Sequence, residues 1–327
     1  MLENIVSKNL ELAEFDRPPS FCLGLSGGID SRVLLELLCR LRKTFKFDLK
    51  AVHLNYHLRG KDSERDEAFV RKICVESQVE LQVHSVNLQK STAIQEQARM
   101  ARLEAYRALP SHDQIIEAHH GDDLVESFLL RLFRGASLNS LVAMKLKSKR
   151  EGRWLWRPLL EVPKAELMSF AQLNALKFRK DLSNNTVAYD RNFIRNKILP
   201  LTRKRFPLAD NAILRSLKNM QSLQDDYQEL IHLEQRAISD QLLKGELDWN
   251  QWAALPESRL RSLVHDGLKE VFGIRLSQIQ TIELCKKLKT LEKFSFNAPQ
   301  DVVFKSHTKF SKVYLTGGRP LKPTKDL

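Results

Sequence analysis

The sequence lacks any long apolar segment. No apolar run approaches the roughly 18–20 residues that a helix needs to cross a bilayer. The N-terminal stretch MLENIVSKNLELAEFDRPP contains acidic side chains and has no apolar core flanked by basic residues. The sequence therefore predicts neither a membrane span nor a secretory signal peptide, and we expect a soluble, cytoplasmic protein.

Cysteine is also scarce, and its spacing excludes several kinds of site. The chain has four cysteines, none of them in a C-x-x-C pair. This spacing argues against a zinc ribbon, an iron–sulfur centre and a dithiol redox pair, and it fits a reducing compartment. Cys22 and Cys39 lie in apolar stretches, so we expect them to fill the core rather than to act as nucleophiles.

Basic residues strongly exceed acidic ones. The formal net charge is +13, with a sequence pI of about 9.6. Such a balance indicates a polyanionic partner, and nucleic acid is the usual one. The cations are clustered rather than spread over evenly solvated faces, in two short stretches that contain Lys145, Lys147, Lys149, Arg150, Arg153 and Arg157, and then Arg179, Lys180, Arg191, Arg195, Lys197, Arg203, Lys204 and Arg205.

The first half of the chain alternates between strand-like and helix-like patterns. Apolar or alternating runs are each followed by a segment with apolar residues at helical spacing, and these runs cover residues 21–25, 49–55, 79–86 and 114–120. This alternation predicts a Rossmann-like α/β fold, in which helices cover both sides of a parallel sheet. Ligands bind such sheets beyond the carboxyl ends of the strands, where we expect SGGIDS, HLNYHLR and AHHGDD to gather.

The second half is less regular. Residues 138–157 are basic and irregular, and we expect helices at about 164–176 and 207–244, with another that Pro200 stops. Residues 302–315 alternate like the strands of a small module. A length of 327 residues suggests about two domains, and we predict a catalytic domain over 1–206 and a helical and small β domain over 207–327.

The motif SGGIDS, residues 26–31, lies between a predicted strand and an amphipathic helix. Gly27 and Gly28 lack Cβ atoms, so the backbone can turn tightly and aim successive N–H groups at one point. The following helix N-terminus adds donors for phosphate oxygens, as do the hydroxyls of Ser26 and Ser31. Asp30 is an anion, so we expect it to bind magnesium or to orient a group at the loop. No lysine follows the glycines, whereas a γ-phosphoryl transferase normally places a cation there.

SGGIDS resembles the PP-loop of the N-type ATP pyrophosphatases, which adenylate a substrate oxygen and release pyrophosphate. Further segments resemble, in the same order, the motifs of the tRNA(Ile)-lysidine synthases: HLNYHLRGKDSERDEAFVRKIC, QEQARMARLEAY, AHHGDDLVES, RPLLEVPKAEL and DLSNNTVAYDRNFIRNKILP. Together these segments are specific, and they cover roughly residues 20–205.

That resemblance implies ATP-dependent ligation of free L-lysine to C2 of the wobble cytidine in a tRNA(Ile) with a CAU anticodon. Cytidine O2 attacks the α-phosphate, pyrophosphate leaves, and the lysine amine then displaces AMP from the adenylated base. The implied cofactors are ATP, bound by Ser26, Gly27, Gly28, Ile29, Asp30 and Ser31, and Mg²⁺ at Asp30. The C-terminal domain would bind tRNA, and a homodimer is left open.

The resemblance also assigns roles to other side chains. Arg102 and Arg195 would offset charge on phosphate oxygens during catalysis. Asp123 and Glu126 share one helix face and would hold the ammonium groups of lysine. The remaining expected pocket residues are His53 and His119.

Structural explanations stay open for several of these residues. Asp122, Asp123 and Glu126 also suit the positive end of a helix dipole, and His53 and His57 also suit structural positions. Trp154 and Trp156 either stack on bases or lie on a half-buried strand.

The chain departs from the family pattern at several positions, which include the following four. Tyr56 stands in place of a histidine, and Leu103 in place of a tyrosine. Ser137 and Ser140 stand where glycines are usual; if those glycines have positive φ, each serine costs about 1 kcal/mol. Two alternatives remain beside the ligase: a PP-loop tRNA thiolase, and a tRNA-binding relative without catalytic activity.

Overall fold

The computed structural model describes residues 1–15, 19–58, 60–88, 94–110, 112–150, 153–179, 190–244, 246–290, 295–299, 303–307 and 312–316. Its contacts divide the chain into two compact units, Met1–Gln221 and Ser222–Leu327. The boundary falls within the long helix α10 (Ala209–Leu243). The assignment of separate roles to 1–206 and 207–327 stays a prediction.

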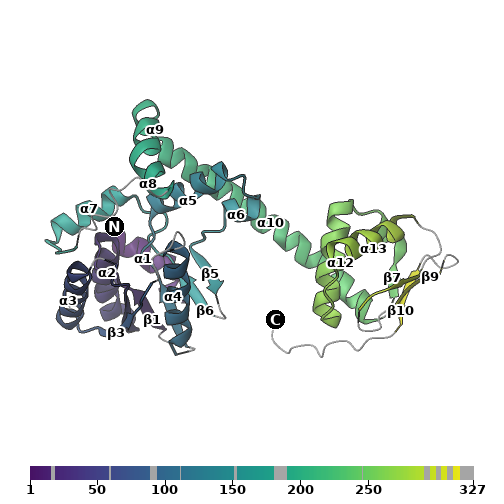
Figure 1. Ribbon diagram of the computed structural model, residues 1–327, viewed down its shortest axis with the longest axis horizontal. Coiled ribbons are helices and arrows are strands. Elements are labelled where there is room, and N and C mark those ends of the chain that lie inside the picture. The colour runs from purple at the N-terminus through teal and green to yellow at the C-terminus, as the bar shows by residue number, and fades with distance from the viewer. Residues whose placement is uncertain are drawn as a thin grey trace. The chain divides into compact units, whose positions relative to one another are not determined.

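The first unit is built on a six-stranded sheet with the order β3-β2-β1-β4-β6-β5 (Figure 1). All neighbouring strands are parallel except β5, which runs antiparallel to β6 at the edge. The strands are β1 (Ser20–Gly24), β2 (Asp48–Asn55), β3 (Glu80–Ser85), β4 (Asp113–Ile116), β5 (Lys147–Arg150) and β6 (Arg153–Trp156). The predicted Rossmann-like α/β fold is therefore confirmed, and β1 and β4 flank the point where the strand order reverses.

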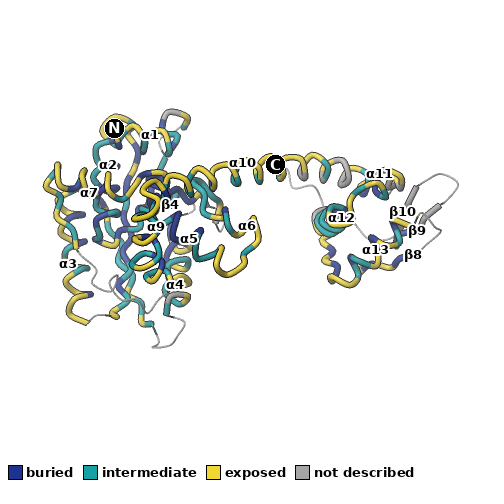
Figure 2. The backbone as a smooth tube through the Cα atoms, turned by 90° about the horizontal axis from the view of Figure 1, so that it is seen from above, coloured by how far each residue is buried: buried dark blue, intermediate teal, exposed yellow. Residues whose placement is uncertain are grey.

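Helices cover both faces of this sheet because successive side chains of its strands point to opposite sides. Phe21 and Leu23 of β1 belong to a core shared with one group of helices, whereas Cys22 belongs to a core shared with α4 (Ile94–Ala108). The first group consists of α1 (Leu2–Asn9), α2 (Ile29–Phe45), α3 (Lys61–Glu76) and α7 (Lys164–Leu173). Figure 2 shows the buried backbone within these layers. The sequence did not predict α1.

The basic segment 138–157, which was predicted to be irregular, contains regular elements in its described residues. It contains the short helix α6 (Leu138–Leu141) and the hairpin of β5 and β6. Lysines in β5 obscured the strand pattern, yet an edge strand tolerates them because its outer side faces water. The alternation at Trp154 and Trp156 marks β6, where Trp156 is buried and Trp154 is more than one-third exposed.

Pro200 does not stop a helix, which corrects a second prediction. The chain runs from α8 (Asp190–Phe193) through a π-helical turn, η3 (Ile194–Ile198), into α9 (Leu199–Arg205). Proline lacks an N–H group and clashes with the carbonyl of the preceding turn, which breaks ordinary α-helical bonding. Here Pro200 lies in the first turn of α9, where the missing donor costs least, and the wider π turn precedes it. The predicted loop at 181–189 lies outside the described residues.

The second unit combines helices with a four-stranded antiparallel sheet of order β7-β10-β9-β8. Trp252, Leu284 and Phe304 lie in its own buried core. Its elements are α11 (Trp249–Ala253), α12 (Glu257–Phe272), α13 (Gln278–Thr290), β7 (Glu246–Asp248), β8 (Ser295–Asn297), β9 (Val303–His307) and β10 (Lys312–Thr316). The last two strands confirm the pattern seen at residues 302–315.

Candidate active site

Residues 26–31 form the expected turn between β1 and the N-terminus of α2. Gly27 has φ +80°, and a Cβ there would lie 3.1 Å from Cγ2 of Val70, so both conformation and space favour glycine. Ser26 Oγ accepts a hydrogen bond from the Gly28 N–H at 3.3 Å and lies 3.1 Å from Ser31 Oγ. No side chain caps α2, so the N–H groups of its first turn suit an anion.

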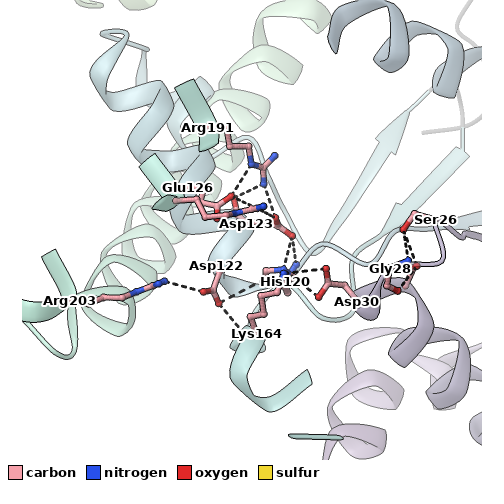
Figure 3. Close-up of polar contacts among 12 residues, drawn as sticks. Ser26, Gly28, Asp30, His120, Asp122, Asp123, Glu126, Lys164, Arg191 and Arg203 are labelled. Carbon is pink, nitrogen blue, oxygen red and sulfur yellow. Dashed lines mark hydrogen bonds and ion pairs between the residues drawn. The ribbon is translucent and has the colours of Figure 1, made fainter. Parts of the chain in front are cut away.

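Asp30, on this first turn, lies beside the helix that follows β4. That helix, α5 (Gly121–Phe133), is preceded by His120, whose side chain is 1% exposed. His120 Nε2 lies 3.6 Å from Asp30 Oδ1 and 3.3 Å from Asp123 Oδ2 (Figure 3). His120 thus connects the glycine-rich loop to α5. From the sequence we expected His119 in this pocket, although AHHGDD contains both histidines.

Asp123 and Glu126 of α5 are paired with two arginines. Arg195 donates from Nε and Nη2 to the two carboxylate oxygens of Glu126, at 2.6 and 2.7 Å. Arg191 donates to Glu126 Oε2 at 2.9 Å and to Asp123 Oδ1 at 2.8 Å. Burial opposes ionisation of Asp123, but His120 and Arg191 hold its pKa below its ordinary value. Hydrogen bonding to Glu126 raises the pKa of Arg195.

The predicted residues Asp123, Glu126 and Arg195 therefore lie together, although Arg195 is 69 residues from Glu126 in sequence. Their roles, with the carboxylates as ligands of an ammonium group and the arginine at a phosphate, stay predictions. Arg191 was noted only as part of a basic stretch, and its place at the carboxylates was missed.

Asp122 connects α5 to α7 and α9. Its Oδ1 accepts a hydrogen bond from the Lys164 backbone N–H at 2.9 Å, and its Oδ2 accepts one from Arg203 Nη2 at 3.0 Å. Lys164 Nζ also lies 3.6 Å from Asp30 Oδ2. Four carboxylates thus face four permanent cations here: Asp30, Asp122, Asp123 and Glu126 against Lys164, Arg191, Arg195 and Arg203.

Arg102 and His119 belong to a second group, centred on Glu117. Arg102 Nη1 lies 3.7 Å from Glu117 Oε1, while His119 Nδ1 lies 3.2 Å from Oε2. Arg157 Nη2 lies 3.4 Å from the same Oε2, and the Tyr106 hydroxyl donates to Oε1 at 3.3 Å. The structure thus brings Arg102 to the end of β4 but gives it no contact with Asp123 or Glu126 among the described interactions. Glu117 was not among the site residues predicted from the sequence.

Acid should destabilise the protein through Glu117. Burial opposes its ionisation, but His119, Arg157 and Arg102 hold its pKa well below the ordinary value of 4.5. Such a carboxyl contributes stability that is present above the unfolded-state pKa and lost as pH falls toward the folded-state pKa. The free energy of unfolding in urea should therefore fall between about pH 5 and about pH 3. Glu117→Gln should make this fall smaller, and an unchanged slope in that variant would contradict the assignment.

Similarity to known proteins identifies the family of the chain. Residues 1–202 match the PP-loop domain family. The chain belongs to the PP-loop domain family. It is 35% identical over 283 residues to a tRNA(Ile)-lysidine synthase from Histophilus somni (strain 2336), covering 85% of this chain and 65% of the relative. It is 37% identical over 221 residues to a tRNA(Ile)-lysidine synthase from Haemophilus ducreyi, covering 66% of this chain and 50% of the relative.

The chain therefore spans between half and about two-thirds of the length of these curated PP-loop relatives. A solved U34-tRNA thiolase from Methanococcus maripaludis, with its 4Fe–4S cluster, superposes with a TM-score of 0.56 at 20% identity. That match covers 67% of this chain and 77% of the thiolase, and at this identity it shows a shared fold alone.

The PP-loop residues fit the magnesium ion that the sequence argument placed at Asp30. Asp30 Oδ1 is buried without a hydrogen-bond partner, and a carboxylate oxygen is a ligand that Mg²⁺ prefers. The described residues contain no group of three or more metal-binding side chains around one position. Mg²⁺ is commonly held by one or two carboxylates together with substrate phosphates.

The structure explains several of the remaining predicted positions. His53 is buried, its Nδ1 lies 2.8 Å from the Leu25 carbonyl oxygen, and burial lowers its pKa, all of which favour a structural role beneath the PP-loop. Tyr56 donates to the Ala98 carbonyl at 3.3 Å. Ser137 has φ −64° and Ser140 lies in α6, so the strain considered for these serines does not arise.

No helix in the described residues is long and apolar enough to cross a membrane.

Proposed function

We propose that this chain is an ATP-dependent ligase that joins lysine to C2 of the wobble cytidine of a tRNA(Ile) with a CAU anticodon. One observation carries the proposal: Asp30 of the PP-loop lies within 3.6 Å of His120, which in turn lies within 3.3 Å of Asp123. A nucleotide held by the loop would therefore have its α-phosphate near a group of paired carboxylates and guanidinium groups. The names of the curated relatives favour the same reaction.

In this proposal, cytidine O2 attacks the α-phosphate, the α–β bond breaks, and pyrophosphate leaves. The N–H groups at the start of α2 and the arginines stabilise the charge that develops on the phosphate oxygens. Mg²⁺ held by Asp30 would supply further positive charge at those oxygens. Lysine then attacks C2 of the adenylated base through its amine, and AMP leaves.

The pairing of Glu126 with Arg195 implies an exchange of ion-pair partners during the reaction, which was not foreseen from the sequence. An incoming lysine ammonium group would replace one guanidinium group at Glu126 or Asp123. Arg195 would then be available to the phosphate of the adenylated intermediate. Such an exchange keeps the buried carboxylates paired throughout, which avoids the cost of an uncompensated buried charge.

The RNA partner is proposed from surface charge. Lys197, Lys204 and Arg205 are exposed on η3 and α9, and Phe193, the last residue of α8 before η3, is 48% exposed. Cations that neutralise phosphates, combined with an exposed ring that can stack on a base, suit a single-stranded RNA loop. We further propose that residues 207–327 contribute to tRNA binding.

The thiolase alternative requires a sulfur-carrying cysteine or a cluster held by cysteines, and in both cases the thiolate form is needed. Burial raises the pKa of Cys22 and of Cys285 to about 12 and that of Cys74 to about 11, and it also raises the pKa of Cys39. Such thiols are poor nucleophiles near neutral pH because the reactive form is the thiolate. The chemistry of these four side chains therefore favours the ligase.

A pyrophosphate-release assay tests the proposed function. The reaction would contain ATP, Mg²⁺, tRNA(Ile) with a CAU anticodon, and each amino acid in turn. We expect release to require the tRNA and incorporation to require lysine. A tRNA with a different anticodon is the control, and pyrophosphate release that is independent of tRNA would contradict the proposal.

A further inference from the structure

The PP-loop of this chain has no lysine of its own, yet a lysine from elsewhere lies beside it. Lys164 is the first residue of α7, and its Nζ lies 3.6 Å from Asp30 Oδ2. Asp30 is the second residue of α2, whose N-terminus ends the loop. Figure 3 shows the Lys164 side chain extending toward Asp30 from a different element. In the part of the chain that the structure describes, the ion-pair partners of Asp30 are Lys164 and His120.

The backbone of Lys164 is fixed by contacts with α5. Its N–H group donates to Asp122 Oδ1 at 2.9 Å, and the nearby Val162 carbonyl accepts a hydrogen bond from the Gly121 N–H at 2.9 Å. A Cβ at Gly121 would lie 3.1 Å from that carbonyl oxygen, so the two segments approach as closely as glycine permits. These contacts place the start of α7 against the same helix that carries the paired carboxylates.

The ammonium group is held less tightly than the other cations of the site. Arg191, Arg195 and Arg203 each donate hydrogen bonds to carboxylates at 3.0 Å or less. The distance from Lys164 Nζ to Asp30 is beyond hydrogen-bond length, and its side chain is 38% exposed. A lysine is a point charge on a flexible four-carbon stem, so it can exchange one oxygen partner for another without the geometric demands of a guanidinium fork.

The ammonium charge of Lys164 offsets a repulsion that the Asp30 carboxylate would otherwise exert on phosphates at the loop. Asp30 places a negative charge on the helix turn that faces the phosphates, and an uncompensated carboxylate would repel them. Lys164 offsets that charge in the absence of ligand. When phosphate oxygens enter, the same ammonium group can contact both the carboxylate and the phosphate.

We propose that Lys164 is the phosphate-binding cation of this site and contacts the pyrophosphate portion of ATP. The inference rests on the proposed use of ATP at the PP-loop. As the α–β bond breaks, negative charge accumulates on the departing pyrophosphate, and a fixed positive charge beside it stabilises that state. Lys164 thereby supplies from α7 the charge that a γ-phosphoryl transferase carries within its own loop.

Calorimetric titration of the full chain with inorganic pyrophosphate, in the presence of Mg²⁺, tests this assignment separately from turnover. We expect Lys164→Ala and Lys164→Met to weaken pyrophosphate binding by about tenfold or more, whereas AMP binding changes by less than about twofold. Lys164→Arg should restore most of the pyrophosphate affinity because it restores the charge. The methionine variant retains most of the aliphatic stem, so it separates loss of charge from loss of packing.

Lys218→Ala is the matched control. Lys218 forms an ion pair of similar length with Glu161, at 3.7 Å, and its removal changes the net charge equally, so we expect wild-type affinity for both ligands. Undiminished pyrophosphate binding by Lys164→Met would overturn the inference and leave the proposed function intact. An equal loss of AMP binding would also overturn it. Wild-type protein that binds neither ligand would overturn both proposals.

Discussion

Asp30→Ala is expected to reduce tRNA-dependent pyrophosphate release by at least roughly 1,000-fold while leaving tRNA affinity unchanged. Asp30 contacts both Lys164 and His120, and it offers the buried oxygen suited to Mg²⁺. Its removal therefore acts on several groups that surround the expected phosphate position. Single-turnover release of pyrophosphate and a filter-binding titration with tRNA would measure the two quantities.

Asp62→Ala provides the matched control for this prediction. Asp62 is the second residue of α3, as Asp30 is the second residue of α2, so both substitutions remove a carboxylate from a helix N-terminus. Asp62 is exposed and pairs with Arg65 of its own helix. We expect this variant to retain wild-type turnover. Full turnover by Asp30→Ala would show that the assignment of the site is wrong.

Glu126→Gln is expected to lower the free energy of unfolding by about 3 kcal/mol and to abolish lysine incorporation. The Glu126 side chain is 2% exposed and accepts hydrogen bonds from both Arg191 and Arg195. The neutral glutamine amide forms no ion pair, so Asp123 is the remaining carboxylate that pairs with both arginines. The amide N–H₂ group is a donor, so it cannot accept hydrogen bonds from the arginine N–H groups. Because both arginines retain some contact with water, we expect a loss near the lower end of the range for broken buried ion pairs.

Glu36→Gln is the matched control, because it also removes an ion-paired carboxylate but one that is less buried than Glu126. Glu36 also accepts hydrogen bonds from two arginines, Arg32 and Arg40, but its side chain is 25% exposed. Because the Glu36 carboxylate keeps contact with water, which replaces part of the lost interaction, we expect a loss within about 1 kcal/mol. Urea unfolding of both variants provides the comparison. Equal losses would contradict a special contribution from the buried carboxylate.

The architecture of the sheet followed from local patterns in the sequence. The apolar or alternating runs that predicted the first four strands correspond to β1, β2, β3 and β4. The inner strands β1, β2 and β4 are largely apolar because helices cover both faces of the sheet there, whereas β3, at the edge, is only partly buried and its sequence alternates. The hairpin of β5 and β6, in which β5 forms the opposite edge of the sheet, was missed. An edge strand is partly solvated, so its lysines disguise the periodicity from which strands are recognised. The path of the chain through Pro200 was also missed, because the π-helical turn before it has no recognisable local pattern.

The same distinction holds at the candidate site. The convergence of SGGIDS and AHHGDD was predictable, since each follows a strand and parallel strands end at one edge of the sheet. The choice of His120 over His119 was not predictable. The two are adjacent, and their side chains face different groups, Asp30 and Asp123 in one case and Glu117 in the other.

Local features of the sequence were sufficient to predict the α/β class, the glycine-rich loop and the chemical types of the residues at the edge of the sheet. These features depend on periodicity, on turn chemistry and on short motifs, all of which are local. The tertiary structure alone decided which charges are partners: Glu126 with Arg195, Glu117 with Arg157, and Asp30 with Lys164. Such pairs join segments that are distant along the chain, and their geometry depends on how α5, α7 and η3 pack. The lysine that the loop lacks in sequence is present beside it only in three dimensions.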